Sequence, residues 1–404
     1  MLTLADEKKF SATEDNSNKS WVTPTDEEQK SPPYREGLAL IVGSLLWLGS
    51  YLGLVGVLVP SRIAEIAPAD KTAVVAIMST TAMIVSTIAN IVEGALSDRT
   101  RSRFGRRTPW LIFGSVGSFV MILLWGLASS VWTIILCAAV YQIFLNAIVA
   151  PLIAVLSDRV AKRHRGVLSS MYALGFAIGG YGGQIVAAQF LQISYMGFVA
   201  MAVFALLSGP LAALILKEKS TLDMPVEPLS RRVFVEQFSF PRKNSRDYYL
   251  ALFGKTSIVT AKYTILGYQL YLLTDYMRLS GASVASYIGM ISMILLGTSV
   301  VTTLFSGVLA DKLNVRKLPV IIAGLGMGAF NSVDQALNIE VLPNQRTAAK
   351  DLGILNMANN GGQVLGPLYA GLVISLIGYH AVFWVACVTA LLGVFLISLI
   401  RSVR

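Results

Sequence analysis

The sequence predicts an all-α, polytopic membrane protein, and three observations support this fold class. Hydrophobic residues make up 54% of the 404 residues and charged residues only 14%, whereas soluble domains carry about 25% charged residues. The mean hydropathy is +0.64. The apolar residues gather in segments of roughly 20 residues or more, the length a helix needs to cross the hydrocarbon core. An outer-membrane barrel would show short alternating strands instead.

Eleven segments are long and apolar enough to be membrane-spanning helices, six before a central polar stretch and five after it. Many contain Gly, Ser, Thr and Asn, which suit helices that pack closely on one another. The predicted spans of the first half are 37–60, 72–96, 109–130, 131–156, 166–191 and 195–216. Those of the second half are 248–276, 283–310, 318–342, 351–377 and 379–400.

Two polar stretches lie outside the spans and divide the chain. Residues 1–36 are rich in Ser, Thr, Asp, Glu, Lys and Pro and lack an apolar core. This composition favours a disordered tail over a signal peptide. We predict an N-terminal six-helix bundle over 37–217, a central loop over 218–246 and a C-terminal helical bundle over 247–404.

Lysine and arginine are distributed asymmetrically between the predicted loops. The loops after spans 2, 4, 6 and 8 and the turn at 343–350 carry 5, 4, 7, 3 and 2 basic residues, whereas the opposite loops carry only three. The positive-inside rule therefore places the basic loops and the N-terminal tail in the cytoplasm of a multi-pass cell-membrane protein. This topology, with contact to anionic lipids of the bilayer, accounts for the net charge of +10, and we expect no nucleic-acid partner.

Two pairs of segments indicate an internal repeat. The pattern Gly-x-x-x-Asp occurs at 94–98 and again at 307–311, each time followed by basic residues and a proline. Residues 146–156 and 331–342 form a second, looser pair. Two parallel halves of this kind are the design of a large group of secondary transporters.

The second half is shorter than the first by about one helix. Pro109 and Asn146 are 37 residues apart, whereas Pro319 and Asn331 are 12 apart. The segment 318–342 is therefore either one span or a fused remnant of two, and a six-plus-six design becomes six-plus-five. The sequence leaves the side of the C-terminus open. If every span crosses once, the last basic residues lie outside, namely Arg346, Lys350, Arg401 and Arg404.

The loop after the second span resembles a loop of the major facilitator superfamily. It reads Gly94-x-x-x-Asp98-Arg99-x-Arg101-x-Arg103-x-Gly105-Arg106-Arg107. The longer string DRTRSRFGRRTPW at 98–110 is similar to sugar–cation symporters of the glycoside–pentoside–hexuronide group and to sucrose-type carriers. The resemblance implies alternating-access symport of a sugar with a cation. Melibiose-permease-like carriers have a sodium-binding acidic residue where this chain has Asn90, so we expect a proton instead.

The same loop suggests a conformational latch. The carboxylate of Asp98 is placed to pair with Arg99 or Arg106 and to cap a facing helix, while Gly94 permits a close helix approach. Such a cluster would hold two rigid bundles in one conformation, and the alternative is that the arginines are only the topology signal. Because the pattern recurs, the predicted latch residues are Gly94, Asp98, Arg99, Arg106, Gly307 and Asp311.

Polar residues within the spans by default face an interior cavity, since they are costly in lipid. Several occur at helical spacing, for example Gln142 with Asn146 and Lys255 with Lys262, and Tyr268 and Tyr271 follow the two lysines closely. Amides and aromatic rings suit a polyhydroxylated ligand, although hydrogen bonding between helices is the alternative for any single residue. The predicted cavity residues are Gln142, Asn146, Lys255, Gln269, Asn331, Asn356 and Asn360.

Coupling to protons needs a group that can titrate within a span. Asp334 lies mid-span on an amide-rich face and is the first choice, and Glu93 is the second. Asp275 and Glu340 lie near helix ends, where we expect them to be solvated. The predicted partners are therefore a small-molecule solute, a coupling proton and the bilayer, and we expect a monomer.

Other classes of function receive little support. Two Cys and two His residues, far apart in the sequence, exclude a Cys-rich metal site and disfavour a catalytic triad, so we expect neither enzyme activity nor a cofactor. No P-loop is present. Glycine runs at 175–183 and 361–367 leave two interpretations open, close packing and similarity to drug–proton antiporters. The alternatives are thus efflux of amphipathic compounds and an inactive, truncated carrier.

Overall fold

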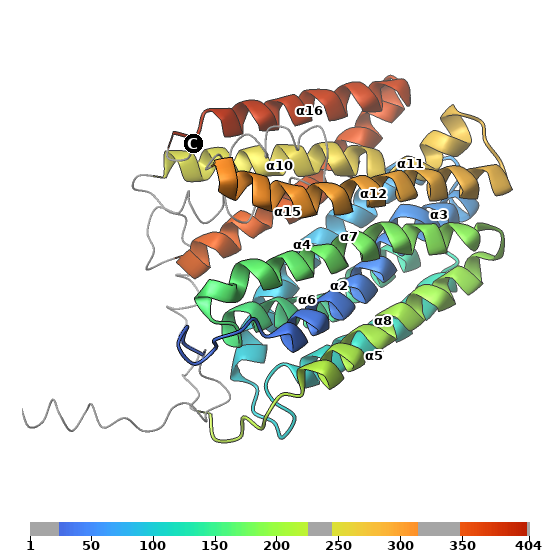
Figure 1. The fold of residues 1–404 in the computed structure, drawn as a ribbon. Coiled ribbons are helices and arrows are strands. Elements are labelled where there is room, and N and C mark those ends of the chain that lie inside the picture. The colour runs from blue at the N-terminus through green and yellow to red at the C-terminus, as the bar shows by residue number, and fades with distance from the viewer. Residues whose placement is uncertain (1–23, 225–244, 314–347, 402–404) are drawn as a thin grey trace, which may run out of the picture.

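The computed structural model describes residues 24–224, 245–313 and 348–401, where the regular structure is entirely helical. The N-terminal half comprises α2 (Tyr34–Gly53), η2 (Leu54–Leu58), α3 (Val59–Ile66), α4 (Lys71–Arg99), α5 (Thr108–Gly126), α6 (Val131–Asp158), η3 (Lys162–His164), α7 (Arg165–Gln189), η4 (Leu191–Ile193) and α8 (Ser194–Leu216). The C-terminal half comprises α10 (Arg246–Leu266), α11 (Gln269–Tyr271), η5 (Leu272–Tyr276), α12 (Ala282–Leu313), α15 (Ala348–Leu376) and α16 (His380–Ser398). The long helices of the two halves lie side by side (Figure 1), which confirms the predicted fold class.

Seven helices among the described residues are long and apolar enough to cross a membrane, by length and composition. Three others, α7, α10 and α15, are of similar length but less apolar, because they contain glycines, amides or lysines. Buried polar residues of this kind suit helices that face other helices rather than lipid. The predicted span at 318–342 lies outside the described residues.

The first helix of each half contains a π-helical turn near the same end of the molecule. In the first half η2 joins α2 to α3, and Pro60 is the second residue of α3. Because proline has no N–H to donate to the preceding turn, a wider turn at this position is a recognised adjustment. The second half has its π-helical turn at η5, after α11.

Glycines allow α7 to pack directly against the backbone of α2. Gly175, Gly179 and Gly183 follow one another at intervals of four residues and therefore share one face of α7. A Cβ added at Gly183 would lie 2.0 Å from the carbonyl oxygen of Gly49, and one at Gly179 would lie 2.2 Å from that of Leu45. Close packing, one of the two interpretations of this run, is thus confirmed.

The second half repeats this contact between α15 and α10. A Cβ at Gly366 would lie 2.8 Å from the backbone nitrogen of Thr264, and one at Gly362 would lie 2.6 Å from the side chain of Val259. In each half the first long helix packs on the two last ones, α2 on α7 and α8, and α10 on α15 and α16. Between the halves, α4 packs on α15 and α12 packs on α7. This symmetry supports the internal repeat.

The symmetry also locates where the second half is short. The helices α4 and α7 are joined by residues 100–164, a connection of 65 residues that contains α5 and α6. The equivalent helices α12 and α15 are joined by residues 314–347, a connection of 34 residues. Two membrane crossings need about 40 residues before any turn is counted. The length that the second half lacks therefore falls where the first half has its third and fourth long helices, α5 and α6.

The C-terminus lies at the same end of the molecule as the start of α10. The backbone N–H of Arg401 donates to the Asp247 carboxylate at 2.9 Å. Moreover α10 and α15 run parallel, whereas α12 runs in the opposite direction. The start of α15 therefore lies at the end where α12 finishes (Figure 1). This is also the end that holds residues 99–108, which we call the basic end. Of the placements that the sequence left open for Arg401, the structure shows the one at the same end as the arginine-rich loop.

Part of the predicted N-terminal tail is ordered at the basic end. The Gln29 side chain donates to the carbonyl of Arg159 at 3.1 Å and accepts from the backbone N–H of Ala161 at 2.8 Å. Asp26 accepts from the backbone N–H of Arg163 at 3.1 Å. Residues 24–33, within the predicted tail, therefore pack against the connection between α6 and α7.

Candidate functional site

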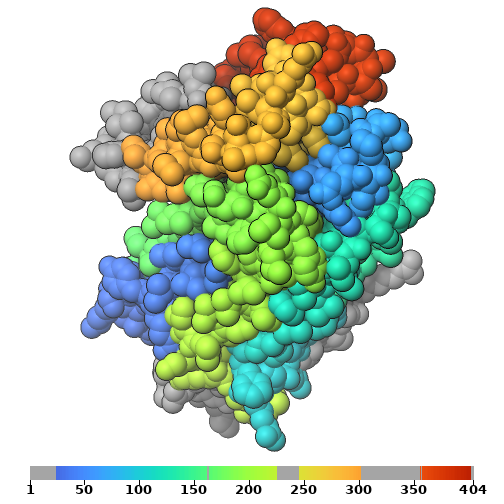
Figure 2. Space-filling model, turned by 90° about the vertical axis from the view of Figure 1, so that its right-hand side faces the viewer, coloured from blue at the N-terminus to red at the C-terminus, as the bar shows by residue number. Residues whose placement is uncertain are grey.

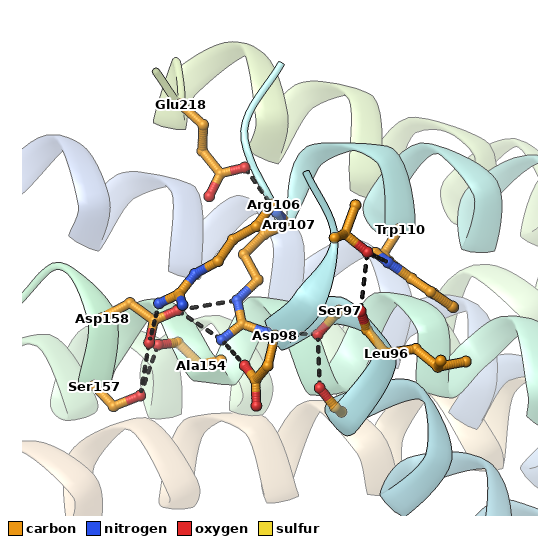
Figure 3. A network of polar contacts seen from close by, with 12 residues as sticks. Leu96, Ser97, Asp98, Arg106, Arg107, Trp110, Ala154, Ser157, Asp158 and Glu218 are labelled. Atoms are coloured by element: carbon orange, nitrogen blue, oxygen red, sulfur yellow. Dashed lines mark hydrogen bonds and ion pairs between the residues drawn. The ribbon is translucent and has the colours of Figure 1, made fainter. Parts of the chain in front are cut away.

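A buried arginine organises the basic end. The side chain of Arg107, which is 3% exposed, lies between two carboxylates (Figure 3). Its Nη2 lies 2.5 Å from Asp98 Oδ1 and 2.7 Å from Asp158 Oδ2, and its Nη1 lies 2.5 Å from the hydroxyl of Ser97. Burial opposes the charge, but the carboxylates of Asp158 and Asp98 outweigh it and raise the pKa of Arg107. The guanidinium is thus permanently charged.

A second carboxylate network fixes the start of α5. Glu218, just after α8, accepts the backbone N–H groups of Arg107 at 2.9 Å and Thr108 at 2.8 Å, and the Thr108 hydroxyl at 3.0 Å. These are donors that a helix start leaves without an intrahelical partner, and a carboxylate there also complements the helix dipole. Gly105 has φ +92°, and a Cβ on it would lie 2.3 Å from the Cβ of Glu218.

The pairing differs from the predicted latch in two respects. Asp98 binds Arg107 rather than Arg99 or Arg106, and Arg106 binds Asp158 at 2.7 Å. The carboxylate that caps α5 is Glu218, not Asp98. Sequence spacing could not identify these partners, because Asp158 and Glu218 come from distant parts of the chain.

The other predicted latch residues contribute less among the described atoms. No described atom lies within 4 Å of a Cβ placed on Gly94, so the expected close helix approach is not observed there. Arg99 forms no ion pair within the described part of the chain. Gly307 and Asp311 lie in α12, but in a stretch whose side chains are not described. Each partner described for the cluster belongs to the N-terminal half.

Amides meet around α4 halfway along the molecule. Asn90 donates to the Asn146 side chain of α6 at 3.0 Å, and Asn146 donates to Ser86 at 2.9 Å. One turn away, Asn360 of α15 donates to the hydroxyl of Thr87 at 3.0 Å. Two predicted cavity residues, Asn146 and Asn360, therefore both lie against α4. Each forms hydrogen bonds between helices there.

Glu93 lies one turn further along α4 and is 5% exposed. Its Oε2 has no hydrogen-bond partner within the described residues. A buried carboxylate without a partner is costly in its charged form. Among the described residues, Glu93 is thus the acidic side chain within a span whose surroundings suit a proton-binding group.

A partly open cavity lies between the halves. Tyr51, Trp125 and Gln142 contribute to its wall from the N-terminal half, and Tyr263 and Gln363 contribute from α10 and α15. The hydroxyl of Tyr51 donates to Gln363 Oε1 at 3.0 Å and so connects the halves. Of the predicted cavity residues, Gln142 lines this space.

At the end opposite the basic end, which we call the far end, the halves are bonded to each other. Lys71 at the start of α4 pairs with Asp275 of η5 at 2.6 Å, and the hydroxyl of Tyr379 donates to the same carboxylate oxygen at 2.6 Å. The Lys71 ammonium also lies 4.9 Å from the Tyr271 ring centre. In Figure 2, which faces this end, the blue segment near 70 contacts the yellow and orange segments near 280. Asp275 is therefore paired with Lys71 and Tyr379, and its side chain, which is 28% exposed, is only partly solvated.

Two tyrosines complete this closure through backbone carbonyls. The hydroxyl of Tyr271 donates to the carbonyl of Pro60 at 2.9 Å. That of Tyr268 lies 2.8 Å from the carbonyl oxygen of Thr72 and 2.9 Å from that of Pro367. Both rings are fully buried and bridge the halves. In this conformation they are therefore not available to stack on a sugar, although their position in the sequence had suggested that role.

The remaining predicted residues are distributed as follows. Gln269 is buried beside these tyrosines, and its Nε2 has no partner among the described residues. Lys255 is buried in α10. Asn331, Asp334 and Glu340 lie outside the described residues, and so does the side chain of Asn356. Lys71 and Tyr379 were missed, because single polar residues at helix ends are ordinary in a sequence.

Two repeated helical halves around a cavity that is closed at one end define a secondary transporter rather than an enzyme. The sequence profile of the Major Facilitator Superfamily matches residues 39–325 and 320–404, and the chain belongs to this family of multi-pass membrane transporters. Among curated proteins none matches the chain.

Solved structures with the same fold are known. A bacterial homolog of the human lysosomal transporter Spinster, in an inward-facing and unoccupied conformation, is 15% identical, with a TM-score of 0.61 over 92% of this chain and 95% of that one. The human organic anion transporter MFSD10 (TETRAN) is 16% identical, with a TM-score of 0.60 over 91% of this chain and 100% of that one. At such identities the likeness shows the fold alone. Neither is described as a sugar–cation symporter, so the sugar-group resemblance rests on the loop at 98–110.

Proposed function

We propose that the chain moves a small organic solute across the cell membrane by alternating access, coupled to protons. The observation that carries this proposal is the cavity between the halves, whose far end is closed by hydrogen bonds and an ion pair between the halves. Symmetry-related halves that contact at one end can rock to contact at the other. The basic end is assigned to the cytoplasm by its arginines and lysines.

Two solute classes are supported by different features. The resemblance of the 98–110 loop and the amides around α4 support a sugar or another polar solute. The cavity wall supports the second candidate, an amphipathic compound, because methionine, valine, leucine and aromatic residues form most of it. MFSD10 is described as an organic anion transporter, which agrees with a solute larger and less polar than an inorganic ion.

The proposal is tested without knowledge of the solute. Proteoliposomes that contain the purified protein are given an inward proton gradient in a mixed solute extract, and their contents are analysed by mass spectrometry. We expect at least one organic solute to exceed its external concentration only when both protein and gradient are present. Identical contents in protein-containing and protein-free liposomes would contradict the proposed transport.

Glu93 provides the residue-level test of proton coupling. A residue that binds the coupling proton is needed for uphill movement but not for exchange of solute across the membrane. We expect Glu93→Gln to abolish gradient-driven accumulation, more than tenfold, while exchange at equal concentrations survives. Glu65→Gln, which changes an exposed acid at the far end, is the matched control. Undiminished accumulation in Glu93→Gln would remove Glu93 from coupling and leave Asp334, outside the described residues, as the candidate.

A further inference from the structure

We infer that the solute bound between the halves is an uncharged, flat, largely apolar molecule that presents a hydrogen-bond acceptor, such as an amide or lactam carbonyl. This inference rests on the proposed function and narrows its substrate class. It follows from three properties of the cavity wall: its apolar surface, one unpartnered donor and its lack of charge.

The apolar surface disfavours a sugar. Nine of the fifteen lining residues have no polar side-chain atom, among them Met78, Met83 and Pro367. Each buried sugar hydroxyl without a partner would carry a desolvation cost, and a wall of this composition supplies few partners. A flat apolar body instead gains contact with the rings of Tyr51, Trp125 and Tyr263 on the walls of the same space, since aromatic rings favour offset or edge contacts.

The unpartnered donor selects an acceptor on the solute. Trp125 lines the cavity and is 2% exposed, yet its indole Nε1 has no hydrogen-bond partner among the described residues. An indole N–H can only donate, and a buried donor of this kind normally has an acceptor. Gln363 already accepts from Tyr51 through Oε1, so its amide nitrogen presents further donors. The Trp125 indole and the Gln363 amide are therefore the donors that we assign to a carbonyl oxygen of the solute.

The lack of charge disfavours ionic solutes. The lining contains no Asp, Glu, Lys, Arg or His among the described residues. A charged solute in this space would lose hydration without gaining an opposite charge. Lys262 is next to Tyr263 in α10, and its ammonium lies 5.5 Å from the centre of that ring. Lys262 is not itself among the lining residues.

The test compares four probes that differ in charge or in polarity. They are 2-quinolone, a neutral lactam; N-methylquinolinium, a cation on the same ring system; quinoline-2-carboxylate, an anion; and lactose. Binding to the full chain in lipid nanodiscs is measured by titration calorimetry, with empty nanodiscs subtracted. We expect 2-quinolone to bind at least tenfold more tightly than the other three.

A pair of variants distinguishes binding in the cavity from nonspecific binding elsewhere on the protein. Trp125→Phe keeps a ring but removes the N–H donor, and we expect it to weaken 2-quinolone binding about tenfold. Trp132→Phe removes an indole that is 79% exposed and should leave binding unchanged. Melting temperatures of both variants confirm that they are folded. If Trp125→Phe does not fold, Gln363→Leu takes its place, with the exposed Gln189→Leu as control.

The outcomes distinguish this inference from the proposed function. Absence of 2-quinolone binding, equal loss in both tryptophan variants, or tighter binding of lactose or of either ion overturns the inference. If lactose accumulates in proteoliposomes under a proton gradient while 2-quinolone does not bind, the inference fails and the transport proposal stands. If 2-quinolone binds through Trp125 but no solute accumulates in the mixed-extract assay, the inference stands and proton-driven transport fails.

Discussion

At the residue scale, Arg107 shows why a pattern can identify a cluster but not its bonds. The sequence supplies five arginines between 99 and 107, and electrostatics alone does not decide which one Asp98 binds. The choice depends on burial. Arg107 immediately precedes α5, where its side chain points between α4 and α6, and it meets Asp158 at the end of α6. Only the fold brings Asp158 and Glu218 to this place.

Loss of the Arg107 charge should destabilise the protein. Arg107→Gln leaves Asp98 and Asp158 close together, with Asp158 mostly buried. Because removal of one partner of a buried ion pair costs about 3 kcal/mol or more, we expect a clearly lower melting temperature in detergent. Arg103→Gln changes an exposed arginine of the same loop and should have almost no effect. Equal melting temperatures for the two variants would contradict a structural role for Arg107.

At the scale of the element, helix length and apolar composition were predictable, whereas helix crossings were only partly so. All ten described long helices coincide with predicted spans, because about 20 apolar residues have few alternatives. The glycine run of α7 indicated a close crossing but not its partner. The π-helical turns at η2 and η5 were not predicted, since they depend on how Pro60 and the far-end contacts are accommodated.

Two adjacent glycines of α7 provide a matched pair for the crossing with α2. Gly183→Ala would place a methyl group 2.0 Å from the Gly49 carbonyl oxygen, whereas Gly182→Ala would place it where no described atom lies within 4 Å. Overpacking of a rigid interface typically costs about 1–3 kcal/mol. We expect Gly183→Ala to lower the melting temperature and Gly182→Ala to leave it unchanged or slightly raised. The reverse order would mean that α2 and α7 do not cross at these residues.

At the scale of the whole molecule, the repeat was readable from sequence but its topology was not. The 94–98 and 307–311 patterns predicted two halves, and the packing of first, second, fifth and sixth helices confirms them. The side of the C-terminus depended on how often 314–347 crosses, which an apolar count cannot decide. The parallel course of α10 and α15 and the bond from Arg401 to Asp247 decide it.

Labelling from the two sides tests the orientation. Single cysteines replace two exposed residues, Phe104 at the basic end and Trp132 near the far end, after Cys137 and Cys387 are changed to Ala. In intact cells an impermeant maleimide should label the cysteine at 132 and not the one at 104. A third cysteine at 401 should behave like the one at 104, because both lie at the same end. Labelling of 104 from outside would invert the assignment.

The last prediction concerns the contacts that hold the far end closed. Tyr271 donates to the Pro60 carbonyl across the halves and supports Lys71 with its ring. Tyr271→Phe keeps the ring and removes the hydroxyl, a loss of about 1 kcal/mol. If that bond exists only in this conformation, the equilibrium should shift roughly fivefold toward the form that is open at the far end. A cysteine at Ser79 in the cavity wall should then react about fivefold faster with an impermeant maleimide added from that side. Tyr276→Phe, which changes an exposed tyrosine of η5, is the control and should not alter the rate. Unchanged labelling in Tyr271→Phe would show that the far-end bond is equally present in both conformations and does not act as a gate.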